Sequence, residues 1–103
     1  MMPTALYPNW KDRIVYGEAG PEPQILLEDE KIKLILGGLK PGQQIPDHPE
    51  GQAVYYFLEG EGVLTADGEA MPVKAGSIVT MPAGTVRGVK AETQLAFMAL
   101  RVA

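Results

Sequence analysis

Glycine and proline interrupt this sequence so regularly that no long helix fits between them. The chain contains 12 glycines and 9 prolines, which are spread along its length and not gathered into a linker. We find no window of eleven or more residues that carries a clear helical apolar stripe and is free of both residue types. Both residues are poorly tolerated inside helices, so this spacing favours short strands joined by turns.

Short stretches with strand character lie between these breaks. Asp67-Gly68 is typical of the two-residue turn of a β-hairpin. The candidate strands are residues 12–16, 24–28, 31–39, 52–60, 63–66, 69–74, 77–81, 85–89 and 93–102. Roughly nine or ten short strands at regular spacing predict an all-β sandwich or barrel. We see no repeat and no domain boundary, so residues 1–103 are expected to form a single domain.

The last stretch, residues 92–102, fits two kinds of secondary structure. Leu95, Met98, Ala99 and Val102 follow a 3.6-residue period, as in an amphipathic helix. A strand accounts for the same residues comparably well. The all-β character of the rest of the chain favours the strand.

Composition excludes several classes of function. The net charge is −4, and the basic residues are scattered, so a nucleic-acid phosphate surface is not expected. The chain has no cysteine, which excludes disulfides, thiolate nucleophiles and cysteine-based metal sites. No apolar run approaches the ~20 residues that span a membrane, and the first residues do not resemble a signal peptide. These features fit a cytoplasmic protein.

One motif in the second half of the chain is distinctive. Gly76 is followed by five residues, by the tripeptide Pro-Ala-Gly at 82–84, by two residues and then by Arg87. This spacing resembles the second sequence motif of the cupins, a family of small double-stranded β-helix (jelly-roll) barrels. In metal-binding cupins a ligand histidine stands where this chain has Arg87, and an asparagine stands where it has Ala91.

The first cupin motif fits the segment around the only histidine, His48, in two alignments. In the alignment that we favour, Gly60 closes the motif, Pro46 and His48 take the two histidine positions, and Ala53 takes the glutamate position. This alignment keeps the glycines of a hairpin, which are the more constrained feature. The resemblance covers about residues 32–101, after an N-terminal arm of about residues 1–20.

The second alignment starts the motif at Gly42. His48 is then the first histidine, while Glu50 and Tyr55 replace the second histidine and the glutamate, and Gly62 closes the motif. Both alignments give the strand the same alternation. His48, Ala53, Tyr55 and Phe57 are therefore expected to face the barrel interior, and Tyr56 the opposite side.

The substituted positions argue against a family-type metal site. Proline and alanine cannot ligate a metal, and the Arg87 guanidinium is a fixed cation that repels a divalent ion. His48 and Glu50 are the remaining weak metal candidates. We expect no cofactor, except for a divalent metal bound adventitiously or through altered ligands.

Arg87 is the strongest clue to function. A cation that faces an apolar interior needs a partner. That partner is either internal, such as Asp47, Glu50 or a backbone carbonyl, or an anionic ligand bound in a two-pronged geometry. The residues expected to contact a small and possibly anionic ligand in the barrel are His48, Ala53, Tyr55, Phe57, Arg87 and Val89.

Two enzymatic alternatives stay open. Some cupin-fold isomerases and epimerases work without a metal, and this resemblance gives His48 as candidate base and Tyr55 as candidate acid. A dioxygenase-type cupin with altered metal ligands is the second alternative. The sequence does not decide whether the protein is an enzyme.

A homodimer is expected from the pattern of apolar residues. Val54, Tyr56 and Leu58 alternate with the interior residues of the same strand, so they should form an apolar outer face. The N-terminal arm, with Tyr7 and Trp10, either covers its own barrel or crosses to a partner subunit. No nucleic-acid or membrane partner is expected.

Overall fold

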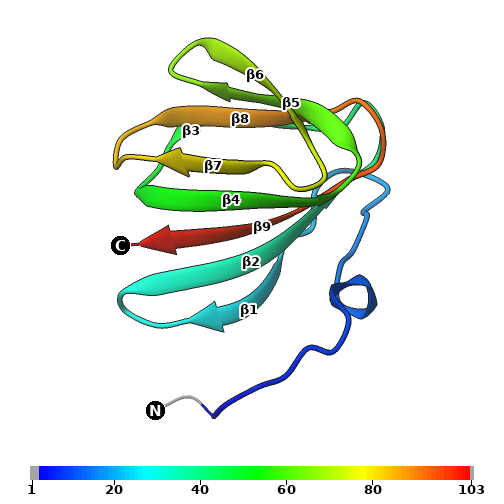
Figure 1. Ribbon diagram of the computed structural model, residues 1–103, viewed down its shortest axis with the longest axis vertical. Helices are drawn as coiled ribbons and strands as arrows, with labels where there is room; N and C mark the ends of the chain where they lie inside the picture. The colour runs from blue at the N-terminus through cyan, green and yellow to red at the C-terminus, as the bar shows by residue number, and fades with distance from the viewer. Residues whose placement is uncertain (1–2, 103) are drawn as a thin grey trace.

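A computed structural model describes residues 3–102 of the chain, which form two antiparallel β-sheets (Figure 1). The five-stranded sheet contains, in spatial order, β1 (Gln24–Glu28), β2 (Ile32–Leu39), β9 (Leu95–Val102), β4 (Gln52–Glu59) and β7 (Ile78–Met81). The four-stranded sheet contains, in spatial order, β3 (Gln44–Pro49), β8 (Val86–Ala91), β5 (Glu61–Ala66) and β6 (Glu69–Lys74). This is a jelly-roll, or double-stranded β-helix, and the all-β prediction is confirmed.

The core lies between the inner faces of the two sheets. Along β4 the burial alternates, because Ala53, Tyr55 and Phe57 are buried while Val54 and Tyr56 are exposed. The predicted alternation of this strand is therefore confirmed. Three aromatic rings fill the centre: Tyr55 stacks on Phe97 with centroids 5.2 Å apart, and Phe57 lies 5.7 Å from Phe97.

The C-terminal stretch forms a strand, as the all-β context predicted. Strand β9 pairs along its whole length with β2 on one side and with β4 on the other. A helix there would leave the backbone groups of both neighbouring strands unpaired, which is costly in a buried sheet. Among the described residues, no helix has the length and apolar character needed to cross a membrane.

Strand β3 was not predicted, since its prolines suggested a loop. It lies at the edge of the four-stranded sheet and pairs only with β8, with an irregularity between Ile45 and His48. Proline lacks an N–H donor and is tolerated at such edges. Pro46 can therefore lie within β3 without interrupting the strand.

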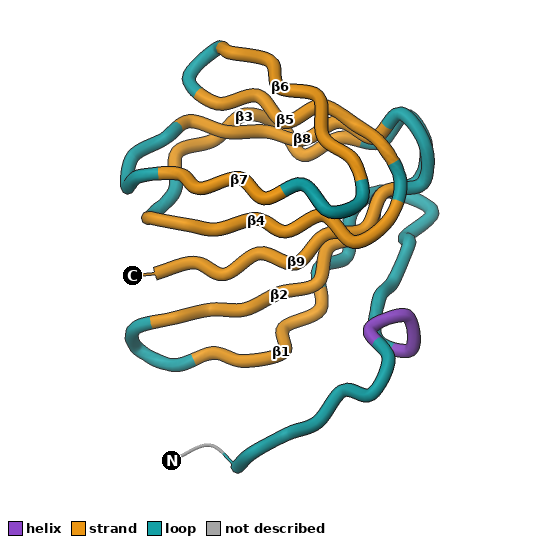
Figure 2. Tube along the Cα trace, in the orientation of Figure 1, coloured by secondary structure: helices purple, strands orange, loops and turns teal. Residues whose placement is uncertain are grey.

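The predicted strand at residues 12–16 is wrong. A 3-10 helix, η1 (Trp10–Asp12), is followed by unpaired chain that runs beside the barrel (Figure 2). Both edges of β2 are already paired with β1 and β9, so the arm cannot pair with β2 as a strand. It lies instead on the outer face of β2, where a side chain at Gly38 would come within 2.6 Å of the Val15 carbonyl oxygen.

The arm is fixed to its own barrel by polar contacts. The Tyr16 hydroxyl donates to the Glu59 carboxylate at 3.2 Å, and the Gln43 side chain donates to the Gly17 carbonyl oxygen at 2.8 Å. Burial and the neighbouring Glu59 charge raise the pKa of Tyr16 to about 12, so this donor keeps its proton at neutral pH. In the structure of this single chain, the arm lies over its own barrel.

Gly38→Val should displace the arm, because the added side chain would overlap the backbone of Val15. We expect the free energy of unfolding in urea to fall by about 1–3 kcal/mol. Limited trypsin digestion should also cut faster after Lys11 and Arg13. Ala70→Val adds comparable bulk at an exposed position of β6 and serves as the control. Equal digestion of both variants would contradict this account of the arm.

Candidate functional site

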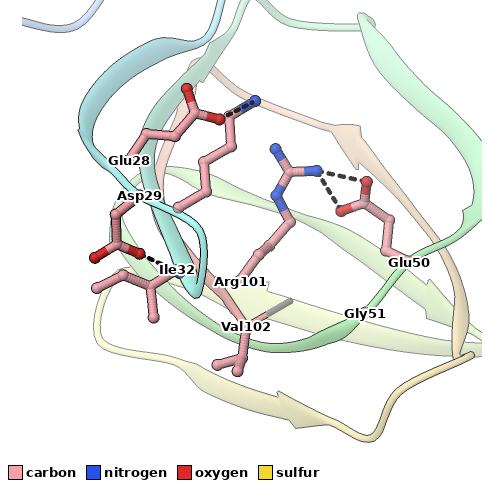
Figure 3. Close-up of a pocket in the computed structure, with 8 residues that line it drawn as sticks. Glu28, Asp29, Ile32, Glu50, Gly51, Arg101 and Val102 are labelled. Carbon is pink, nitrogen blue, oxygen red and sulfur yellow. Dashed lines mark hydrogen bonds and ion pairs between the residues drawn. The ribbon is translucent and has the colours of Figure 1, made fainter.

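Charged side chains gather at one end of the barrel. There the turns β1–β2 and β3–β4 lie beside the C-terminal end of β9 (Figure 1). A cavity of about 280 Å³ opens between them (Figure 3). It is lined by Glu28, Asp29, Ile32, Lys33, Glu50, Gly51, Arg101 and Val102.

The carboxylate of Glu50 is the centre of this cluster. Nη1 of Arg101 donates to both of its oxygens, at 2.5 and 2.6 Å (Figure 3). Nη2 of Arg87 lies 3.5 Å from Oε2, and Nε2 of His48 lies 3.6 Å from Oε1. The two arginines come from different sheets, Arg101 from β9 and Arg87 from β8. One carboxylate thus neutralises part of the charge of two guanidinium groups.

Arg87 is fully buried, and it has the internal partner that we had considered. Its Nη2 donates to the carbonyl oxygen of Gly51 at 2.6 Å, in addition to facing Glu50. Its Nη1 is 3.7 Å from the sulfur of Met81, and its guanidinium lies 5.8 Å from the centre of the Tyr55 ring. Its Nε, however, is buried without a hydrogen-bond partner among the described residues.

Gly51 allows the β3–β4 turn to approach β9 closely. A Cβ atom at this position would lie 2.7 Å from the Val102 carbonyl oxygen, which real side chains do not tolerate. The close approach places the Gly51 carbonyl oxygen within reach of Arg87 and the Glu50 side chain within reach of Arg101. The glycine is therefore part of the geometry of the site.

The electrostatics of the cluster favour the ionised form of Glu50. Burial by itself raises the pKa of its carboxyl group. The hydrogen bonds and charge of Arg101, with smaller contributions from His48 and Arg87, outweigh that effect and hold the pKa of Glu50 below its ordinary value of 4.5. Burial also raises the pKa of Tyr55, so its hydroxyl is protonated at neutral pH, although the nearby charge of Arg87 opposes this.

His48 lies at the rim of the site, with 39% of its side chain exposed. Its Nδ1 is 2.8 Å from the Pro46 carbonyl oxygen, which can only accept, so Nδ1 carries the proton of this bond. The residue stands directly opposite Arg87 in the pairing of β3 with β8. Its Nε2 thus faces Glu50 and becomes a charged partner of that carboxylate when the ring is protonated.

The other predicted ligand contacts form part of the apolar core. Ala53, Tyr55, Phe57 and Val89 are at most 5% exposed and pack in one cluster with Phe97. The structure brings Arg87 together with Tyr55 on one side and with Glu50 on the other. Of the predicted site residues, only Glu50 lines the cavity at the end of the barrel, while Arg87 contacts Glu50 from the interior and the apolar residues fill the core.

Sequence reasoning missed Arg101, although a signal was present. Leu95, Phe97 and Ala99 of β9 face the core, and Arg101 continues the same alternation. A single cation at the end of an otherwise apolar inward-facing row indicates a charged site at the mouth of the barrel. Its partner Glu50 lies 51 residues earlier in the chain, so no local pattern predicts the pairing.

The side chains at this end do not suit a divalent metal. Within residues 3–102, no group of three or more histidine, cysteine, aspartate or glutamate side chains converges on one point. Of the two weak metal candidates, Glu50 lies 3.5 Å from Nη2 of Arg87, and His48 faces Glu50. A fixed cation at that distance opposes a second one, so these residues do not fit a cupin-type metal.

A protein-family comparison identifies this architecture. The model of the cupin domain family matches residues 36–102, which is more than half of the chain. The chain belongs to the cupin family. The match includes both sequence motifs, with Arg87 in the place of a metal-ligand histidine. Among curated proteins, none matches this chain.

Solved structures with the same fold cover nearly the whole chain. A protein of unknown function from Streptococcus pyogenes is 22% identical, with a TM-score of 0.85, over 98% of this chain and 90% of its own. An RmlC-like cupin from Desulfovibrio desulfuricans is 25% identical, with a TM-score of 0.80, over 99% and 96%. A predicted oxalate decarboxylase from Thermotoga maritima is 24% identical, with a TM-score of 0.73, over 86% and 98%. These likenesses establish the cupin fold and leave the specific function open.

Glu50→Gln should weaken the response of stability to acid. Because the pKa of Glu50 is lowered in the folded protein, its contribution to stability is present above pH 4.5 and is lost as the pH falls through the folded value. The variant should lose about 1–3 kcal/mol of unfolding free energy at pH 7. On acidification from pH 7 to pH 3, its free energy of unfolding should fall by less than that of the wild type, as measured by urea denaturation. Glu28→Gln, on the exposed ion pair with Lys33, is the control and should keep the acid response of the wild type.

Proposed function

We propose that this cupin binds a small carboxylate at the end of the barrel through Arg101 and Arg87. The observation that carries the proposal is the convergence of two guanidinium groups, from two sheets, on one carboxylate. Guanidinium groups bind carboxylates strongly because they offer several donors in a fixed plane. Arg101 lines a cavity of about 280 Å³, which gives a small ligand access to its guanidinium group, and Arg87 lies fully buried beside the same carboxylate.

The remaining walls suggest which carboxylates would bind. Ile32 and Val102 supply an apolar wall. Glu28 and Asp29 bring two carboxylates, and Lys33, whose Nζ lies 3.7 Å from Glu28, offsets only one of these two charges. A second acidic group on the ligand would face those carboxylates and be repelled. A monocarboxylate that also carries a hydroxyl or amino group suits the cavity better than a dicarboxylate.

The arrangement favours binding over the two enzymatic alternatives. An isomerase that uses His48 and Tyr55 needs a substrate in contact with both side chains. Tyr55 is 5% exposed and stacked on Phe97, whereas His48 is at the rim. A metal-dependent dioxygenase would require a cation next to Arg87, which the donor set opposes.

Titration of the protein with glycolate and glycine, each compared with oxalate, tests the proposal. Oxalate is included because the Thermotoga maritima neighbour is a predicted oxalate decarboxylase. The monocarboxylates should bind more tightly than oxalate by isothermal calorimetry. Arg101→Gln should weaken monocarboxylate binding by about tenfold, which corresponds to about 1.4 kcal/mol. Lys90→Gln, on an exposed part of β8, is the matched control and should leave the affinity unchanged.

Arg87→Met provides the second arm of this experiment. Methionine keeps an unbranched side chain in the core but removes the charge. If neither arginine variant differs from wild type in affinity, the carboxylate site is wrong. A wild type that binds none of the three compounds at millimolar concentration would also contradict the proposal.

We also propose that the protein forms a homodimer through the outer face of the five-stranded sheet. Val54, Tyr56 and Ile78 are 40%, 37% and 65% exposed on neighbouring strands β4 and β7. Leu100 and Met98 of β9 continue this face beside Val54 and Tyr56. A contiguous apolar surface of this kind supports association with a second copy of the same face.

Ile78→Glu should shift the protein toward the monomer, because it places a charge on this apolar face beside Tyr56. Sedimentation velocity at several protein concentrations measures the change, and the dissociation constant should rise at least tenfold. Val86→Glu places the same charge on a side chain that is 39% exposed in the other sheet and should leave association unaffected. A wild type that is monomeric at high concentration would refute the dimer.

A further inference from the structure

Glu50 occupies the place that the proposed ligand carboxylate would take. Its side chain is 17% exposed and borders the cavity together with Arg101, whose side chain is 26% exposed. The Glu50–Arg101 pair is therefore not sealed in the core, and an incoming carboxylate reaches Arg101 from the cavity side.

The contacts of Glu50 leave the arginines incompletely satisfied. Both of its oxygens accept from a single nitrogen of Arg101, Nη1, as the two dashed lines in Figure 3 show. The Nε atoms of Arg101 and Arg87 are both buried and have no hydrogen-bond partner within the described chain. The Nη2 of Arg87 is 3.5 Å from Glu50, which is beyond an ordinary hydrogen bond.

The attachment of Glu50 to the chain limits how its carboxylate meets Arg101. The Glu50 backbone is held in place because its carbonyl oxygen accepts from the Gly84 N–H at 2.8 Å. From this fixed point the carboxylate accepts from Nη1 of Arg101 and leaves Nε without a partner in the described chain. The carboxylate of a free ligand is not attached to the chain, so it can adopt the two-pronged geometry that arginine prefers.

We propose that Glu50 is an internal competitor, whose carboxylate fills the arginine site until a small ligand carboxylate displaces it. This inference rests on the proposed function, and it adds how the site is regulated. Displacement requires only that the Glu50 side chain rotate toward solvent, since the backbone bond to Gly84 holds the β3–β4 turn in place. A ligand then binds only those molecules in which Glu50 has left the site. The apparent affinity of the wild type is the intrinsic affinity multiplied by the fraction of those molecules.

The test compares acetate binding to wild type, Glu50→Ala and Glu50→Gln. Glu50→Ala removes the Cγ methylene and the carboxylate, and acetate supplies the same two carbons and two oxygens, so it should replace the missing contacts. We expect Glu50→Ala to bind acetate at least tenfold more tightly than wild type, as measured by the shifts of arginine Nε–H resonances in NMR titrations. Acetate should also raise the melting temperature of this variant more than that of the wild type, at equal ionic strength set with chloride.

Glu28→Ala is the matched control, because it removes a carboxylate from the same cavity without touching the arginines. It should bind acetate with no more than a twofold gain. If Glu50→Ala does not fold, Glu50→Gln carries the comparison, since the amide keeps the volume and loses the charge. That variant should bind acetate at least threefold more tightly than wild type.

The outcomes separate this inference from the proposed function. If folded wild type and Glu50 variants bind acetate equally, the carboxylate site stands and the internal competitor is refuted. Weaker binding by the Glu50 variants would also refute it, because Glu50 would then help to hold the ligand. If none of these proteins binds acetate, the proposed function fails, and this inference fails with it.

Discussion

A guanidinium group in an apolar barrel needs a partner, and the arrangement of this end of the molecule follows from that need. Arg87 is fully buried beside Tyr55 and Met81, where an unpaired charge would be very unfavourable. Removing a single partner from a buried ion pair typically costs about 3–5 kcal/mol. The β3–β4 turn supplies both compensating groups, the Gly51 carbonyl oxygen and the Glu50 carboxylate.

This requirement links the two sheets. Arg87 belongs to the four-stranded sheet and Arg101 to the five-stranded sheet, and Glu50 contacts both. Gly51 makes the contact feasible because only a residue without a side chain fits against the end of β9. The ionic cluster therefore closes one end of the barrel, while the stacked aromatic rings of Tyr55 and Phe97 fill its centre. An interior filled in this way leaves the charged end as the part of the barrel suited to recognition.

Replacement of a metal-ligand histidine by arginine changes the kind of chemistry that the cupin barrel offers. A histidine lone pair attracts a cation, whereas a guanidinium attracts an anion. The internal carboxylate of Glu50 fits this reversed preference, as does the rim position of His48. The family membership of the chain therefore defines its fold, and the substituted positions distinguish its charged end from that of a metal-binding cupin.

Features that depend on short sequence periods could be predicted from the sequence. The alternation along residues 52–59 predicted which side chains of β4 face the core, and the motif spacing predicted that Arg87 faces it too. The Asp67-Gly68 pair predicted a tight hairpin, and both residues have the positive φ angles that such a turn requires. The strand expected at residues 12–16 failed because strand propensity does not report whether a segment pairs at a sheet edge or packs on a sheet face, as this one does at Gly38.

By itself, the sequence determined the all-β architecture, the cupin motifs and the presence of an inward-facing cation. These depend on residue type and on spacing along a few neighbouring positions. Only the tertiary structure decided that Glu50 meets Arg101, that the arm covers its own sheet at Gly38, and that the cavity lies at the end of the barrel and not in its centre. Each of these depends on contacts between segments far apart in the chain, which follow from strand order and side-chain volume and leave no local pattern.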